Sequence, residues 1–222
     1  MGTCVAMTVR RLLKTAAALG AALTVAACDT ETVGGAVVSQ LLKRGEATDG
    51  GTNVAQFLAQ AKGSVALIAF EGTDKTSVAA VVANNQGYAT YLNPEGQSVT
   101  ARHGMLSATR GFANDIMSSD LDSSLALVRA KRTGTATRQM RYLDGQGQTF
   151  TLSLSCKVQL GDQLQLESGE VKASTRIVVE SCQNGEVSFD NTYMVDNRGE
   201  ILSSRQWINP QVGTVIFQLL RR

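Results

Sequence analysis

Hydrophobic and polar residues alternate along the segment 149–160. The apolar positions are Phe150, Leu152, Leu154, Cys156, Val158 and Leu160, and the positions between them are polar. A period of two places the apolar side chains on one face of a β-strand and leaves the other face in water. One wet face is typical of an antiparallel sheet. The pattern therefore predicts an amphipathic strand with Cys156 on its buried face.

Apolar runs separated by turn residues continue through most of the chain. We predict strands at 65–70, 77–83, 88–92, 98–101, 138–143, 147–160, 163–167, 175–182, 187–195 and 201–208, with Gly161-Asp162 as the turn between 147–160 and 163–167. Helical spacing is seen at 37–44 and 53–62. The stretch 103–124 fits neither period and is predicted to be a loop with one or two short helices, after which 125–131 returns to strand. The fold class is therefore mainly β, an antiparallel β-sandwich or barrel-like sheet with a few short helices.

The first 30 residues follow a different pattern. Arg10, Arg11 and Lys14 precede an apolar run at 15–25, and small residues then lead to Cys28. A basic segment, an apolar segment and small residues are typical of a secretory signal peptide. The cysteine that follows resembles the lipobox of bacterial lipoproteins, in which the thiol is lipidated before cleavage. The alternative is a plain signal peptide with a cysteine nearby by chance.

This N-terminus predicts the domain organisation. We expect a lipoprotein signal peptide over 1–27, the lipidated Cys28 with a tether over 28–36, and one β-rich extracytoplasmic domain over 37–222. The chain has 21 Lys and Arg against 19 Asp and Glu, and three of the basic residues belong to the signal peptide. The mature chain is thus close to neutral, so its charge gives no reason to expect nucleic-acid binding.

The cysteines indicate a disulfide. Cys4 lies in or before the signal peptide and Cys28 would carry lipid, which leaves Cys156 and Cys182. In an oxidising compartment two remaining cysteines are natural partners, and their bridge would contribute roughly 3 kcal/mol on the chain-entropy model. Two buried free thiols are the alternative.

Few residues could catalyse a reaction or bind a metal. His103 is the only histidine, no G-x-S-x-G motif accompanies it, and we assign it a structural or surface role. Zinc would lack ligands once the cysteines are bridged, and the aspartates within 115–122 lack the spacing of a calcium-binding loop. Trp207 and Tyr193 are candidates for stacking on a sugar, although both are more often core residues. We predict no catalytic residue, no metal and no cofactor.

Two motifs carry a resemblance to a known family. One is GMLSATRGFAND at 104–115, and the other is YMVDNRG at 193–199 followed by SRQWINP at 204–210. They are similar to the G-x-L-x-x-T-x-G-hydrophobic-x-x-D segment, the D-x-x-G turn after a tyrosine-bearing strand, and the Q-x-I-x-P ending of the YjbF-type group 4 capsule polysaccharide lipoproteins. Together with the lipobox, the similarity touches most of the mature chain.

The resemblance implies a cellular role. It implies a lipid-anchored envelope lipoprotein, an accessory factor in the assembly or export of exopolysaccharide or capsule rather than an enzyme, with a mostly antiparallel β fold. Its expected partners are the membrane, through the lipid, and other polysaccharide-export proteins. The family suggests the outer membrane, whereas Asp29 directly after Cys28 resembles the inner-membrane retention signal of enteric bacteria. The outer membrane is therefore preferred and the inner membrane stays open.

Four residues in or near these motifs form a candidate binding face. They are Arg110, Asp115, Arg205 and Trp207. Alternatively, they join a loop to the sheet through an arginine–carboxylate pair and core packing, and we favour this interpretation. Two other functions remain as alternatives: a periplasmic enzyme that acts on polysaccharide through carboxylates, and a lipoprotein with a small cavity for a hydrophobic ligand.

Overall fold

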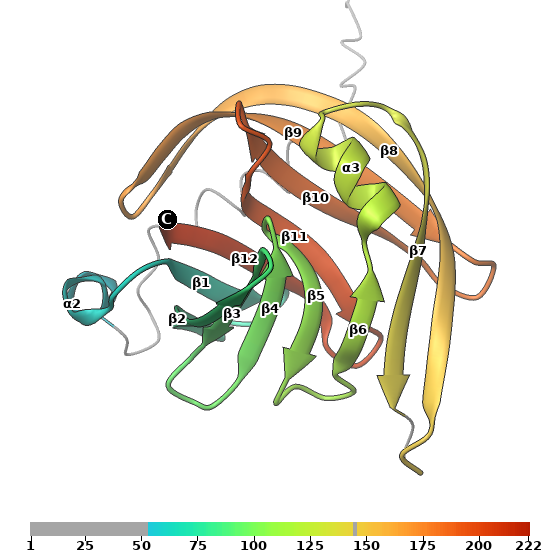
Figure 1. The fold of residues 1–222 in the computed structure, drawn as a ribbon, viewed down its shortest axis with the longest axis horizontal. Coiled ribbons are helices and arrows are strands. Elements are labelled where there is room, and N and C mark those ends of the chain that lie inside the picture. The colour runs from blue at the N-terminus through green and yellow to red at the C-terminus, as the bar shows by residue number, and fades with distance from the viewer. Residues whose placement is uncertain (1–52, 144–145) are drawn as a thin grey trace, which may run out of the picture. The chain divides into compact units, whose positions relative to one another are not determined.

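The computed structural model describes residues 53–143 and 146–222, and Figure 1 shows its fold. Twelve strands form one antiparallel sheet in the order β5-β4-β3-β2-β1-β12-β11-β10-β9-β8-β7-β6. Cys28, the proposed tether and the helix predicted at 37–44 lie outside the described residues.

The elements follow one another along the chain as strands with two short helices. Their bounds are α2 Val54–Gln60, β1 Val65–Phe70, β2 Thr76–Asn85, β3 Tyr88–Leu92, β4 Ser98–Arg102, β5 Met105–Arg110, β6 Ile116–Asp120, α3 Asp122–Arg129, β7 Gly134–Leu143, β8 Thr149–Ser168, β9 Val171–Gln183, β10 Ser188–Asp196, β11 Ile201–Asn209 and β12 Gly213–Arg221. In the described part of the chain, no helix is both long enough and apolar enough to cross a membrane.

The two edge strands, β5 and β6, lie side by side and nearly close the sheet (Figure 1). Side chains bridge this seam. The guanidinium of Arg110 donates hydrogen bonds to the carbonyl oxygens of Thr109 (2.5 Å) and Ile116 (2.9 Å), and the Ile116 N–H donates to the Thr109 hydroxyl (3.0 Å). Covering edges in this way protects their backbone groups from pairing with other chains. The structure thus confirms the mainly β prediction in its barrel-like form.

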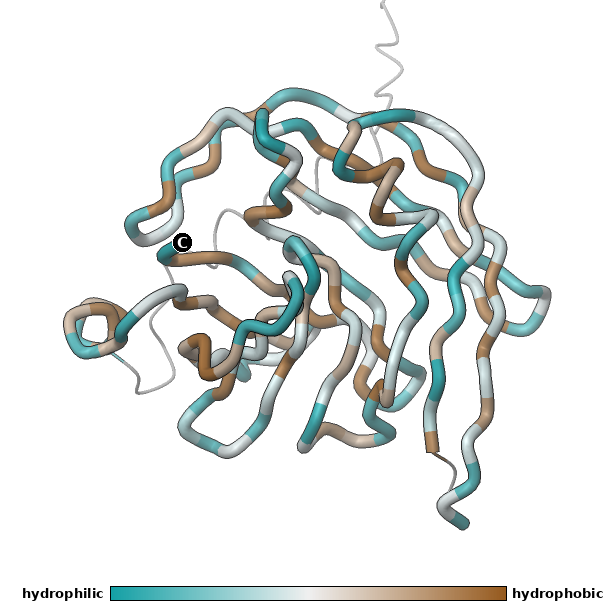
Figure 2. Tube along the Cα trace, viewed as in Figure 1, coloured by the Kyte–Doolittle hydropathy of each residue, from teal (hydrophilic) through white to brown (hydrophobic). Residues whose placement is uncertain are grey.

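Apolar side chains are buried on both faces of the sheet. The interior holds a large cluster that includes Ile68, Leu106, Met140 and Phe217. On the outer face, the far part of the β8–β9 hairpin and helix α2 cover a second cluster around Leu67 and Ile216. The Gln218 side-chain N–H donates to the Ser168 hydroxyl (2.6 Å), which fastens the hairpin to β12. Figure 2 shows how hydrophobic and hydrophilic residues alternate along β8.

The antiparallel order gives the sheet two distinct ends. We call the proximal end the one at which β1 begins and β12 finishes, and the distal end the opposite one. Odd-numbered strands run from proximal to distal, so the connections that follow β1, β3, β5, β7, β9 and β11 all lie at the distal end. This arrangement brings together loops that are far apart in the sequence.

Three local predictions are wrong, each for a physical reason. The stretch 103–124, predicted to be a loop, contains strands β5 and β6. The sequence did not indicate β5 because this strand is buried on both faces and therefore shows no period of two. Residues 125–131 belong mostly to helix α3, whose buried Ser124, Leu125 and Val128 have helical spacing. Gly161 and Asp162 do not form a turn. They lie in a bulge within the single strand β8, where a Cβ on Gly161 would come within 3.0 Å of the Ile177 side chain.

Candidate functional site

A cavity of about 520 Å³ opens at the distal end of the sheet. It lies among four connections, those that follow β1, β3, β5 and β11. Phe70 and Phe112 supply its apolar wall, with their ring centroids 5.3 Å apart. The polar lining includes Asp74, Lys75, Ser77, Glu95, Gln97 and Gln211. Clefts of 300–1,000 Å³ with aromatic walls and a few placed polar groups are typical of small-molecule sites.

Asp115 shapes the loop that carries Phe112. Its carboxylate accepts hydrogen bonds from the Thr109 hydroxyl (2.8 Å) and from the backbone N–H groups of Gly111 (2.8 Å) and Phe112 (3.1 Å). Gly111 adopts φ +85°, a left-handed conformation that glycine accepts without strain. The tight turn thus presents the Phe112 ring to the cavity.

Asn209 joins two of the cavity loops. Its side-chain N–H groups donate to the carbonyl oxygens of Ala113 (2.8 Å) and Asn114 (2.7 Å), while its side-chain oxygen accepts from the N–H groups of Gln211 (2.9 Å) and Val212 (2.7 Å). Asn209 belongs to the 204–210 motif, but the sequence assigned it no role of its own. Its position in an Asn-Pro pair after a predicted strand indicates a turn but no long-range contact.

Further hydrogen bonds fix the part of the cavity wall formed by the connection after β3 and the start of β2. The Asn93 side-chain oxygen accepts from the Gln97 backbone N–H (2.8 Å), and the Gln97 side-chain N–H donates to the Gly111 carbonyl oxygen (3.0 Å). The Ser77 hydroxyl donates to Glu95 (2.8 Å). The polar groups of the cavity are therefore arranged before any ligand arrives, which reduces the entropy cost of binding.

Each residue of the candidate binding face contacts a different partner. Arg110 donates hydrogen bonds across the seam between β5 and β6, and Asp115 accepts hydrogen bonds from the adjacent loop, as described above. Arg205 forms an ion pair with Glu71, with its Nε 2.6 Å from a carboxylate oxygen, and also donates to the Asp190 carbonyl oxygen (3.1 Å). Trp207 stacks on Phe189, with ring centroids 4.3 Å apart. Joint binding by the four residues stays a prediction.

Three of these four residues support the cavity rather than face it as free groups. Asp115 positions Phe112, Arg110 fixes the strand that leads into the same loop, and Arg205 holds Glu71, the residue after Phe70. The ion pair of Arg205 joins β11 to the connection after β1 through Glu71, whereas Asp115, the carboxylate among the four residues, accepts hydrogen bonds from Thr109 and backbone N–H groups. The structure thus brings the end of the 104–115 motif and the 204–210 motif to the rim of a cavity that the sequence did not reveal, whereas the 193–199 motif ends at the proximal end.

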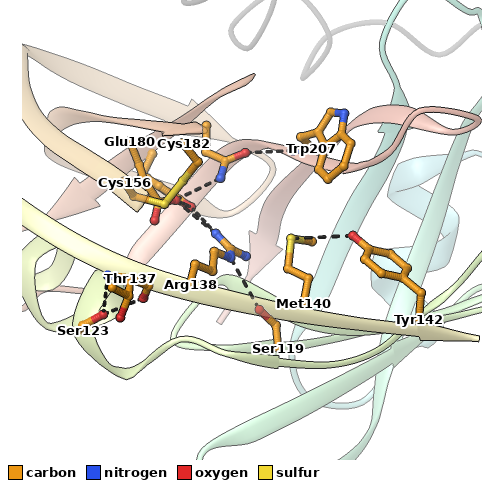
Figure 3. Close-up of a disulfide and its surroundings, with 12 residues drawn as sticks. Ser119, Ser123, Thr137, Arg138, Met140, Tyr142, Cys156, Glu180, Cys182 and Trp207 are labelled. Carbon is orange, nitrogen blue, oxygen red and sulfur yellow. Dashed lines mark hydrogen bonds and ion pairs between the residues drawn. A yellow bond between two sulfur atoms is a disulfide. The ribbon is translucent and has the colours of Figure 1, made fainter. Parts of the chain in front are cut away.

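The interior contains a buried polar network centred on Arg138 and Glu180, whose side chains are 1% and 0% exposed. The guanidinium lies 3.0 Å from the carboxylate and donates to the Leu106 carbonyl oxygen (3.3 Å). The same carboxylate oxygen accepts hydrogen bonds from the Tyr193 hydroxyl (2.7 Å) and the Asn191 amide (2.9 Å). In Figure 3 the Arg138 guanidinium points towards Glu180. The network joins β5, β7, β9 and β10.

Electrostatics keep this pair charged. Burial alone would raise the pKa of Glu180, but Arg138 and the hydrogen bonds to the carboxylate outweigh burial and lower this pKa below its ordinary value. Burial and the adjacent carboxylate raise the pKa of Tyr193, which stays protonated. Tyr193 is fully buried in the network, so its ring is not available to stack on a sugar.

The predicted disulfide is present between Cys156 and Cys182, directly opposite positions on β8 and β9. It lies beside Glu180 in Figure 3. The two sulfur atoms and the Glu180 carboxylate lie within 4.8 Å of one another. Because bridged cysteines have no thiolate to donate, this group does not have the donors of a metal site. The Nδ1 atom of His103 lies 2.9 Å from a Glu200 carboxylate oxygen, a hydrogen-bond contact that joins two proximal connections.

Comparisons with known proteins place these observations in a family. No match was found among curated proteins. A solved structure with the same fold is the hypothetical lipoprotein YmcC from Escherichia coli (K12), with a TM-score of 0.64 and 16% identity over 72% of this chain and 88% of that one. Residues 45–220 match the family model described as "Group 4 capsule polysaccharide lipoprotein gfcB, YjbF". The chain belongs to this YjbF family of group 4 capsule polysaccharide lipoproteins.

Proposed function

We propose that the protein is a lipid-anchored envelope lipoprotein that acts as a non-catalytic accessory factor in the assembly or export of exopolysaccharide or capsule. The observation that carries this proposal is the family match over 45–220, which covers nearly all of the β-rich sheet. The lipobox at Cys28 supports the anchor. The family description names a polysaccharide and a lipoprotein but no reaction.

The alternatives receive less support from the structure. Side chains of the apolar cluster and of the Arg138 network occupy much of the interior between the described strands, which leaves a hydrophobic carrier only the cavity of about 320 Å³ beside Tyr91 and Phe217. The carboxylates of the distal cavity, Asp74 and Glu95, are the ones that an enzyme could use. If the purified protein shortened the polymer, and Glu95→Gln stopped this, the enzyme would replace our proposal.

The anchor predicts covalent lipid on one cysteine. Cells grown with an alkyne-bearing fatty acid should label the wild-type protein, and Cys28→Ser should abolish the label because the thiol is the attachment atom. Cys4→Ser is the matched control and should keep the label. Two or more acyl chains give lasting attachment, since each buried methylene contributes about 0.8 kcal/mol. Equal labelling of both variants would contradict the lipobox.

Separation of the inner and outer membranes by density then shows which membrane holds the protein. We expect the labelled wild type in the outer membrane, together with the Asp29→Ser variant. Wild type in the inner membrane, and release of Asp29→Ser to the outer membrane, would instead show that Asp29 acts as a retention signal.

The role in polysaccharide assembly predicts a phenotype. Deletion of the gene should remove or strongly reduce polymer at the cell surface, measured as cell-associated polysaccharide. A plasmid that encodes the wild type should restore the polymer, whereas Cys28→Ser should not restore it if the anchor is needed. Because the accessory factor is proposed to serve this polymer, an unchanged amount and chain length after deletion would overturn the proposed function. Co-purification from membranes would identify the expected partners among polysaccharide-export proteins.

A further inference from the structure

Aromatic residues gather at the distal end of the sheet. Three ring pairs lie there: Phe70 with Phe112, Phe189 with Trp207, and Tyr142 with Phe150. Together they hold more than half of the chain's aromatic residues. Each of these six residues lies in a distal connection or within three positions of the distal end of its strand. The topology alone brings them to one end, because they come from segments spread over residues 70–207.

All of these rings except that of the buried Tyr142 are only partly covered. The Phe150 side chain is 50% exposed, and Phe70, Phe112, Phe189 and Trp207 are half-buried. Aromatic rings contribute a large free energy when they are fully buried. Rings that stay partly exposed at one end of the sheet are therefore surfaces on which a ligand can stack.

The distal cavity combines one of these pairs with hydrogen-bonding groups. The Phe70 and Phe112 rings line it together with the side chains of Ser77, Glu95 and Gln97. The hydrogen bonds of Asp115 and Gln97 hold this wall in place. A sugar ring has one apolar face of C–H groups and an edge of hydroxyl groups. An aromatic wall beside carboxylate and amide groups complements both parts.

The charge of the cavity lining indicates which kind of saccharide the cavity could bind. Its lining carries two carboxylates, Asp74 and Glu95, and one amine, Lys75. A lining with more negative than positive groups does not favour an acidic sugar, because like charges repel in a partly desolvated cleft. We propose, on the basis of the proposed function above, that the distal cavity binds an uncharged saccharide unit of the exported polymer, with the sugar ring stacked on Phe112.

The test is a binding measurement with the cell's own polymer. The exported polysaccharide is hydrolysed to oligosaccharides and separated by anion exchange into a neutral and an acidic fraction. Each fraction is titrated by calorimetry into the full-length protein in detergent. We expect the neutral fraction to bind. Phe112→Leu should weaken binding about tenfold because it keeps apolar packing and removes the ring, and Phe112→Tyr should restore it.

Tyr88→Leu is the matched control. Tyr88 is an aromatic residue at the proximal end, where the Arg102 guanidinium lies 5.4 Å from its ring centroid, and its loss should leave the affinity unchanged. The thermal midpoint of each variant shows whether it is folded. Binding of the acidic fraction alone, binding of neither fraction, or equal losses in Phe112→Leu and Tyr88→Leu would each overturn the proposal.

The same variants separate this inference from the proposed function. In the deletion strain, Phe112→Leu should restore less polymer than Tyr88→Leu. If deletion removes the polymer but Phe112→Leu restores it fully, the accessory role stands and the saccharide site is wrong. If deletion leaves the polymer unchanged, the proposed function itself is wrong.

Discussion

Replacing Arg138 with methionine should lower the free energy of unfolding by about 3–5 kcal/mol, the usual cost of removing one partner of a buried ion pair. The Arg138 side chain is 1% exposed and pairs with Glu180, which is 0% exposed. Methionine fills a similar volume but leaves the Glu180 carboxylate without its counter-charge. The remaining hydrogen bonds, from Tyr193 and Asn191, cannot replace a cation. Urea unfolding at pH 7, followed by circular dichroism, measures the loss.

The double variant Arg138→Met/Glu180→Gln is the control. Glutamine keeps an acceptor for Tyr193 and Asn191 but carries no charge, so the double variant should recover at least half of the loss. A double variant no more stable than Arg138→Met would contradict this account, because the loss would then come from packing alone.

The stability of the protein should depend on pH through the same Arg138–Glu180 pair. The pKa of Glu180 is lowered in the folded protein, so the stability that its charge contributes is complete above the ordinary glutamate value of about 4.3. This contribution is lost as the pH falls below that value and through the folded pKa. The wild type should therefore lose stability more steeply than the double variant below about pH 4.

Alternation predicted the long strand β8 with its one wet face, and a continuous apolar run predicted the buried strand β1, whereas β5 shows neither pattern. The alternation over 149–160 identified β8 because its outer positions face water. Strand β5 lacks this signal, since its consecutive residues Met105, Leu106 and Ser107 are all buried. Strand β12 was not predicted either, and six of its nine residues are buried with none exposed. Periodicity cannot identify a strand that is apolar on both sides.

The buried Arg138–Glu180 network does have a signal in the sequence. Arg138 occupies an inward position of β7, between Ala136 and Met140, and Glu180 lies between the buried Val178 and Cys182 on β9. A charged residue at an apolar position of an alternating strand indicates a buried charge, and such a charge requires a partner. Two such positions of opposite sign would have suggested the pair.

The distal cavity had no comparable signal. Its walls come from four connections between residues 70 and 212, and each one alone is an ordinary turn. The motifs at 104–115 and 204–210 pointed to the correct region because Asp115 and Asn209 hold those turns together. The cavity itself depends on the strand order, which places β1 next to β12 and far from β5 in the hydrogen-bonding ladder. Local patterns do not specify that order.

Removing the disulfide should also have a large effect. The variant Cys156→Ala/Cys182→Ala should unfold with a free energy about 2–5 kcal/mol lower than the wild type. The bridge closes a loop with a sequence separation of 26, which restricts the unfolded chain, and both side chains are also buried in the interior cluster. Urea unfolding in oxidising buffer gives the difference.

Reductant separates the bridge from the packing of its two residues. Dithiothreitol should destabilise the wild type towards the level of the double alanine variant and leave that variant unchanged, because only the wild type has a bond to reduce. The bridge lies on β8 and β9 beside Glu180, so its loss and the Arg138→Met substitution act on neighbouring groups. Their combined effect should differ from the sum of the two losses, as expected for residues in contact. Strict additivity would show that the disulfide acts on the unfolded chain alone and leaves the folded network undisturbed.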